Sequence, residues 1–139
     1  MKILTNKSGL TLIFFSLFIL FGLTAKSFAQ NGPVMYFCEK YDNGEIGVDN
    51  RFHAGPITVI VRSDYALGLK DANLHVEKYN FTTSAFDVLN NIIFKVTPDK
   101  KYLALASKEL SLDSQGIYKI YLFDNNSKVI TSALVEIIK

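Results

Sequence analysis

A chain of 139 residues, 49% of them hydrophobic, is long enough to form one domain with a sizeable core. Its formal charge of +2 comes from 15 basic and 13 acidic residues, and three of the basic ones (Lys2, Lys7 and Lys26) lie in the first 29 positions, which hold no acidic residue. The remainder therefore carries twelve basic and thirteen acidic side chains, a formal charge of −1. Because nucleic-acid-binding proteins need a surplus of Lys and Arg to displace counterions from phosphates, we do not expect nucleic acid as a partner.

Residues 1–29 have the pattern of a cleaved signal peptide. Two lysines precede an apolar run, Leu10–Leu23, and small residues, Ser27 and Ala29, stand at the −3 and −1 positions of a cleavage site. The run is about 14 residues long, which is shorter than the roughly 20 that cross a bilayer as a helix. We therefore expect an exported protein, in the periplasm or outside a bacterial cell, whose mature chain (30–139) has no transmembrane span.

The mature chain is predicted to be rich in β-strands. Runs with period-two alternation or many β-branched residues recur at short intervals, separated by turn-forming residues. Seven runs are predicted as strands: Val34–Tyr41, Pro56–Ser63, Ala72–Asn80, Asn91–Thr97, Tyr102–Leu110, Ile117–Asp124 and Lys128–Ile138. No segment keeps a helical apolar stripe for three turns, and only Thr83–Leu89 is predicted as a short helical turn. This pattern predicts an all-β fold, an antiparallel β-sandwich of about seven strands.

Alternation along each run predicts which side chains form the core, because successive residues of a strand point to opposite faces. The predicted inward residues are Ile57, Val59, Val61, Leu74, Val76, Ile92, Phe94, Val96, Tyr118, Ile120, Leu122, Ala133, Val135 and Ile137. Cys38 is the only cysteine, so no intramolecular disulfide can form. We expect it to be a buried, inert thiol, with a reactive or intermolecular cysteine as the alternative.

The segment Asp113–Leu122 (Asp-Ser-Gln-Gly-Ile-Tyr-Lys-Ile-Tyr-Leu) resembles the approach to strand F in immunoglobulin-like and fibronectin-type-III-like β-sandwich domains. In that family a turn with Asp and Gly precedes a Tyr whose hydroxyl bonds back to nearby backbone, and the resemblance gives these structural roles to Gly116 and Tyr118. The chain departs from the pattern because Ser114 stands four residues before the Tyr, and Ile120 stands where disulfide-bonded members have Cys. The resemblance therefore implies an immunoglobulin-like topology without the disulfide.

The C-terminal region is also similar to the sorting domains of bacterial type IX secretion cargo. Such domains end in a Gly-x-Tyr strand, a polar turn and a final apolar strand, an outline that Gly116–Tyr118, Asp124–Lys128 and Val129–Ile138 match. The larger cargo and the Pro-Asn-Pro-like start that usually precede these domains are not found. This similarity implies an alternative function as a secretion-sorting or adhesin-type surface module.

The sequence offers no pattern typical of catalysis. Cys38, His53 and His75 are spread over three segments without the spacing of metal ligands, and there is no nucleophile elbow or phosphate loop. We therefore expect no catalytic residue, no cofactor and no metal, and a small hydrolytic or metal-dependent enzyme remains the second alternative. The only calcium candidates are oxygen-bearing residues of one loop that also reads as an ordinary tight turn: Asp42, Asn43, Glu45 and Asp49.

A partner-binding surface is predicted from the face assignments. In an immunoglobulin-like topology, three of the predicted strands lie in one sheet, so their outward residues would share one solvent face. Its predicted binding residues are His75, Tyr79, Lys119, Tyr121, Phe123 and Leu134. The alternatives are that a loop or the N-terminal segment covers this face, or that the aromatic residues are isolated on the surface. The sequence thus predicts an exported, non-catalytic module for protein binding, self-association or envelope assembly.

Overall fold

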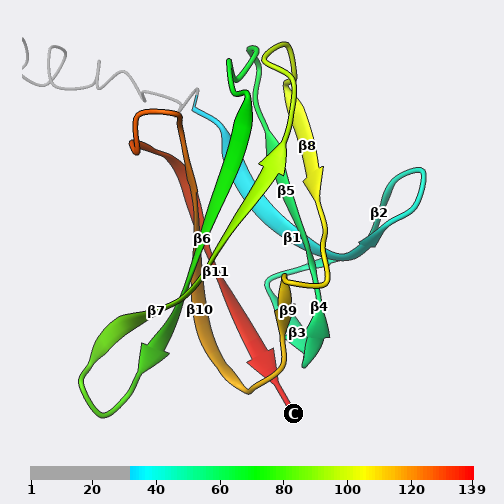
Figure 1. Ribbon diagram of the computed structural model, residues 1–139. Coiled ribbons are helices and arrows are strands. Elements are labelled where there is room, and N and C mark those ends of the chain that lie inside the picture. Colours follow the sequence, from blue (N-terminus) through cyan, green and yellow to red (C-terminus); the bar gives the residue numbers. More distant parts are fainter. Residues whose placement is uncertain (1–31) are drawn as a thin grey trace, which may run out of the picture. The chain divides into compact units, whose positions relative to one another are not determined.

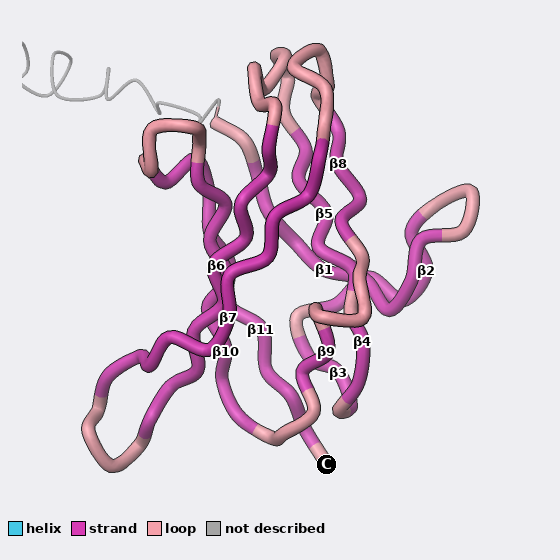
Figure 2. Tube along the Cα trace, in the orientation of Figure 1, coloured by secondary structure: helices cyan, strands magenta, loops and turns pink. Residues whose placement is uncertain are grey.

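The structure is a computed structural model that describes residues 32–139 (Figure 1). The predicted signal peptide, residues 1–29, lies outside the described residues. Within 32–139 the chain consists of strands, turns and loops, with no helix (Figure 2). The prediction of an all-β protein is therefore confirmed for this part of the chain.

Eleven strand segments follow one another along the chain. They are β1 (Val34–Tyr41), β2 (Glu45–Asp49), β3 (Arg51–His53), β4 (Gly55–Pro56), β5 (Thr58–Arg62), β6 (Asp71–Asn80), β7 (Ala85–Lys95), β8 (Tyr102–Leu105), β9 (Ser111–Leu112), β10 (Gly116–Phe123) and β11 (Val129–Ile138). The seven predicted runs overlap β1, β5, β6, β7, β8, β10 and β11 in turn; β1 has the predicted bounds, whereas β7 begins six residues before its predicted run. The segments that the sequence did not predict, β2, β3, β4 and β9, are two to five residues long.

The strands form two main sheets and one short pair. One sheet has the order β2-β1-β5-β8, the other has the order β3-β11-β10-β6-β7, and β4 pairs with β9. All neighbours are antiparallel except β3 and β11, which are parallel. The three runs predicted to share a sheet, now β6, β10 and β11, are neighbours in it (Figure 1).

The hydrophobic core takes side chains from both main sheets. Phe37 and Val59 of one sheet belong to the same buried cluster as Leu74, Ile120 and Val135 of the other. Of the predicted inward residues, all are buried or half-buried, so alternation assigned the faces correctly. Each large apolar side chain removed from water contributes about 1.5–3 kcal/mol to stability. This arrangement is consistent with the predicted β-sandwich.

The predicted helical turn at Thr83–Leu89 is wrong. Ala85 to Leu89 belongs to β7, which pairs with β6 on both sides of one bulge, Tyr79 lying opposite Phe86. The two strands are joined by a tight turn in which Ser84 has a φ of +54°. Short segments carry little intrinsic preference, and here cross-strand pairing decides the conformation.

Cys38 lies on β1 with its side chain on the face opposite that of the core residue Phe37, and it has no exposed surface. Its Sγ donates a hydrogen bond to the carbonyl oxygen of Lys40 at 3.4 Å. Burial raises the pKa of the thiol, which favours the unreactive protonated form. The structure thus places this side chain where a buried, inert thiol was predicted.

The turn before β10 is closed by the side chain of Tyr118. Its hydroxyl donates a hydrogen bond of 2.6 Å to the carbonyl oxygen of Ser114, and the ring is 1% exposed. Gly116 has a φ of +153°, a conformation that residues with a Cβ rarely adopt. The predicted bond from this tyrosine to nearby backbone is therefore present.

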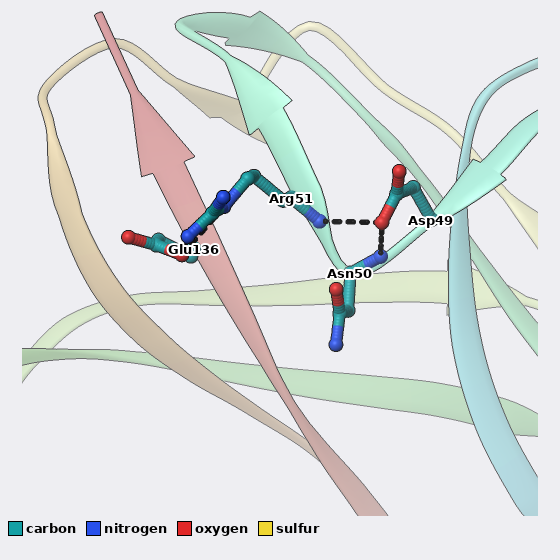
Figure 3. A network of polar contacts seen from close by, with 4 residues as sticks. All are labelled: Asp49, Asn50, Arg51 and Glu136. Carbon is teal, nitrogen blue, oxygen red and sulfur yellow. Dashed lines mark hydrogen bonds and ion pairs between the residues drawn. The ribbon is translucent and has the colours of Figure 1, made fainter.

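A polar network holds the corner between β2 and β3 against β11. Asp49 Oδ1 accepts hydrogen bonds from the backbone N–H groups of Asn50 and Arg51, at 2.7 and 3.2 Å. Figure 3 shows the Arg51 side chain reaching Glu136 on β11, where its Nε and Nη2 each lie 2.8 Å from Oε2. The Glu136 N–H also donates to the Asn50 carbonyl oxygen at 2.8 Å. Backbone and side-chain bonds together fix the parallel pairing of β3.

Candidate functional site

The outward face of the five-stranded sheet gathers the residues that the sequence predicted as a binding surface. Register decides this, because His75 of β6 lies opposite Tyr121 of β10, and Lys119 of β10 lies opposite Leu134 of β11. Directly opposed residues of antiparallel strands point to the same face. Tyr79 also points to it, two pleats from His75. The structure therefore brings the predicted residues onto one face.

Three rings form what we call the aromatic cluster: His75, Tyr121 and Phe123. The ring centroid of His75 lies 6.1 Å from that of Tyr121 and 5.7 Å from that of Phe123, both in edge-on geometries. The Tyr121 and Phe123 centroids are 5.9 Å apart. Such aromatic pairs contribute about 0.5–1.5 kcal/mol beyond their buried area, so the cluster is a preformed, rigid group.

Polar neighbours hold the His75 ring in place. Its Nε2 lies 3.3 Å from Glu77 Oε1 on the same strand. Its Nδ1 lies 3.3 Å from Asn91 Oδ1 on β7. Both neighbours are acceptor oxygens, so a single N–H of the neutral imidazole donates to one of them, and the two contacts together restrain the ring while its edge faces the neighbouring rings.

A second aromatic group lies along the same face. The ring centroid of Tyr79 is 4.9 Å from that of Phe81 and 5.2 Å from that of Phe86. Lys119 links this group to the aromatic cluster, because its Nζ lies 5.9 Å from the Phe86 centroid and 4.7 Å from the Tyr121 centroid. A lysine over an aromatic ring is attracted by the negative face of the ring. The face thus combines two aromatic groups with one shared cation.

Exposed aliphatic side chains extend the surface beyond the predicted residues. Val88 is 64% exposed and Ile93 is 62% exposed, both on β7, and Leu134 is 54% exposed on β11. These fractions show that no part of the described residues covers them. The sequence interpretation missed Phe86 and Val88 because it assigned them to a helical turn. Their period-two spacing was the signal that could have found them.

A polar hollow of about 540 Å³ lies beside the surface. It is lined by the start of β6, the end of β7 and the turn after β10, and includes Asn73, Lys70, Lys95 and Asp124. Asn73 Oδ1 is buried and has no hydrogen-bond partner among the described residues. Lysines and aspartates balance in this hollow, so it carries no dominant charge.

The outward side of the four-stranded sheet carries a different cluster. Glu45 Oε1 accepts hydrogen bonds from the hydroxyls of Tyr36 and Tyr102, at 2.6 and 2.8 Å. These bonds, that of Tyr36 first, hold the pKa of Glu45 below its ordinary value. Burial, followed by the bond to Glu45, raises the pKa of Tyr36 to about 12 and also raises the pKa of Tyr102. The cluster fastens the end of the β1–β2 hairpin to β1 and β8.

The calcium candidates are engaged in other contacts. Glu45 accepts hydrogen bonds from the hydroxyls of two tyrosines, and Asp49 accepts them from two backbone N–H groups. Asp42 and Asn43 lie in the exposed turn between β1 and β2. Within residues 32–139, no three His, Cys, Asp or Glu side chains are grouped as a metal site requires. Calcium binding at this loop stays an untested prediction.

The remaining chemistry-bearing residues lie on separate strands. Cys38 is buried on β1, His53 is exposed on β3 and His75 lies on β6, so the structure does not bring these three side chains together.

In the part of the chain that the structure describes, no helix has the length and apolar character needed to cross a membrane. No protein-family model matches the sequence, and no curated protein is similar to it. The surface itself must therefore carry the functional assignment.

Proposed function

We propose that this protein is an exported, non-catalytic β-sandwich module of immunoglobulin-like topology that binds a protein partner in the bacterial envelope. The strand orders of the two sheets and the hydrogen bond from Tyr118 to the preceding turn support the topology. The signal-peptide pattern of residues 1–29 supports export. Fold alone assigns no function, so binding is argued from the surface.

The observation that carries the proposal is the uncovered aromatic and aliphatic face of β6, β7, β10 and β11. Tyrosine and phenylalanine are enriched at protein interfaces, where they bury a large area with few rotatable bonds. Here the aromatic cluster is restrained by its neighbours, while Val88, Ile93 and Leu134 expose more than half of their side-chain surface. A restrained aromatic centre with an exposed apolar surround is typical of a protein-binding surface.

A capture experiment tests the proposal. The processed chain is used as bait in envelope extract, next to the Tyr121→Ser/Phe123→Ser double variant. Both rings are only half-buried, so we expect the variant to lose its partner while its free energy of unfolding falls only by the contribution of the ring contacts, about 0.5–1.5 kcal/mol for each pair. Tyr65→Ser is the matched control, because Tyr65 is a 51% exposed aromatic residue outside this face. Unchanged capture by the double variant contradicts the proposal. So does a loss of stability larger than the ring contacts account for, because it would show that the rings belong to the core.

A secretion-sorting or adhesin-type module is the second candidate. Its support is the observed succession of a Gly-x-Tyr strand, β10, a polar turn, and the long final strand β11. Fractionation of cells separates the two candidates. Surface attachment with C-terminal processing favours sorting, whereas an intact periplasmic chain favours the binding module.

A further inference from the structure

The strand β7 is the outermost strand of the five-stranded sheet. Its one neighbour is β6, and no other strand of the described residues pairs with its second edge (Figure 1). The strand is 11 residues long, and its apolar Val88, Leu89 and Ile93 are all more than half exposed. A long edge strand presents unpaired N–H and C=O groups that another strand can bind.

Hydrogen-bond alternation shows which residues of β7 present those groups. The Val96 N–H donates to the Lys70 carbonyl oxygen at 3.1 Å, in the same register as the rest of β6 and β7. Pairs that exchange hydrogen bonds alternate with pairs that do not, so Phe94 and Ile92 bond to β6. The N–H and C=O groups of the residues between them, Asn91, Ile93 and Lys95, therefore point away from β6.

An independent contact agrees with this direction. The Asn91 N–H, which the alternation points away from β6, donates a hydrogen bond to a side-chain oxygen, Asn90 Oδ1, at 2.8 Å. For Ile93 and Lys95, no hydrogen bond of the described residues satisfies the backbone N–H. The stretch Asn91–Lys95 is thus a regular, open edge, and the bulge of the β6–β7 pair lies before it, where Val76 and Glu77 face β7.

We propose that two copies of this chain pair through this edge, antiparallel, about a two-fold axis at Ile93. In this register Ile93 lies opposite Ile93 of the second copy, and Asn91 lies opposite Lys95 of the second copy, twice. The N–H and C=O groups of Ile93, the N–H and C=O groups of Lys95 and the C=O group of Asn91 then all face groups of the other copy, and the Asn91 N–H joins them by exchanging its bond to Asn90 Oδ1 for one to the second copy. The two five-stranded sheets become one continuous sheet across the dimer.

The side chains of β7 favour a second copy of the chain as the binding partner of this edge, and they favour this register. On the outward face the 62% exposed Ile93 buries its side chain against its equivalent, and on the inward face Ile92 lies beside Phe94 of the second copy. Lys95 is the one charged residue of Asn91–Lys95, and it meets the neutral Asn91. A two-fold axis at Lys95 would instead place two ammonium groups opposite each other. The strand is therefore self-complementary in hydrogen bonding, apolar contact and charge.

The pairing and the proposed partner binding rest on different groups but share one side chain. The pairing uses the backbone edge of β7 and the side chain of Ile93, whereas partner binding is centred on the rings of β6 and β10, and Ile93 lies at the margin of that surface. If both hold, the dimer presents two copies of the aromatic face on the same side of one sheet.

Sedimentation of the processed chain over a concentration series tests the proposal. We expect a monomer–dimer equilibrium that Ile93→Pro abolishes, because proline removes an N–H that the dimer uses and the monomer does not. Ile93→Thr is the matched control: it keeps the N–H and the β-branch, so dimerisation weakens but persists. Circular dichroism and urea unfolding of each variant check the fold.

Charge variants at Asn91 test the register without proline. In the Asn91→Glu variant, the two-fold axis creates two ion pairs between the copies, each joining the introduced carboxylate to Lys95 of the other copy. We expect these pairs to lower the dimer dissociation constant by roughly 2- to 30-fold. Asn91→Lys is expected to weaken it by a similar factor, and both effects shrink at high salt. A chain that stays monomeric at all concentrations overturns the proposal. So does a dimer that Tyr121→Ser/Phe123→Ser disrupts and these edge variants do not, which would place the contact on the aromatic face.

Discussion

His75 and Tyr121 lie opposite each other on neighbouring antiparallel strands, with ring centroids 6.1 Å apart. One residue comes from β6 and the other from β10, the penultimate strand, so only strand pairing brings them together. The pair anchors the surface on which the proposed function depends. Its position also shows how a period-two pattern, once two strands are in register, converts separate aromatic residues into one site.

Tyr118→Phe should destabilise the domain by about 1–3 kcal/mol, because the change leaves the partly buried Ser114 carbonyl without its 2.6 Å hydrogen bond. Urea unfolding followed by circular dichroism measures the difference. Tyr121→Phe is the matched control, since the Tyr121 hydroxyl makes no hydrogen bond within residues 32–139. Equal stability of the Tyr118 variant and the control would show that the bond does not hold the turn.

Glu45 should make stability depend on pH at both ends of the range. Its lowered pKa means that its contribution is present above the ordinary carboxyl pKa and is lost as the pH falls through the folded-state value. Tyr36 has a pKa raised to about 12, so its contribution is present below the ordinary tyrosine pKa and is lost as the pH rises through about 12. Thermal unfolding across the pH range measures both limits.

Glu45→Gln separates the two effects. The stability of the variant should no longer fall at acidic pH through this residue. The pKa of Tyr36 should fall towards its ordinary value, although burial keeps it partly raised. Spectrophotometric titration of tyrosinate follows this shift. An unchanged tyrosine titration would rule out the contact between Glu45 and the two hydroxyls in solution.

The ion pair between Arg51 and Glu136 should contribute less than about 1 kcal/mol, because the two side chains are 59% and 45% exposed. A double-mutant cycle with Arg51→Ala and Glu136→Ala measures the coupling. The backbone bond from Glu136 N–H to Asn50 should keep β3 paired in both variants. A coupling well above 1 kcal/mol would mean that the side chains, and not the backbone, hold this corner.

Cys38 should not react with a thiol reagent in the native protein and should react fully in denaturant, because it has no exposed surface and its pKa is raised by burial. A colorimetric thiol assay at both conditions checks this. Rapid modification of the folded chain would instead favour the alternative of a reactive or intermolecular cysteine.

Alternation was sufficient to predict the strands whose one face is buried. Leu74 and Val76 on β6, and Ile120 and Leu122 on β10, repeat every second residue, and each pair is buried as expected. The predicted surface followed from the same pattern, because His75 and the residues of β10 between the buried ones must point the other way.

The pattern failed where no core face marks the strand. In the first half of β7 the side chains from Ala85 to Asn91 are exposed or half-buried, so the burial signal was absent and a helical turn was predicted. The strand exists because β6 pairs with it. Phe86 and Val88 therefore entered the surface only through tertiary structure.

By itself, the sequence determined the all-β class, the faces of the main strands and the identity of most surface aromatics, because alternating hydrophobicity is a local property of the chain. Tertiary structure alone decided the register that places His75 against Tyr121, the parallel pairing of β3 with β11, and the open edge of β7 at Asn91–Lys95. These depend on hydrogen bonds between segments distant in the chain, whose partners no local pattern specifies.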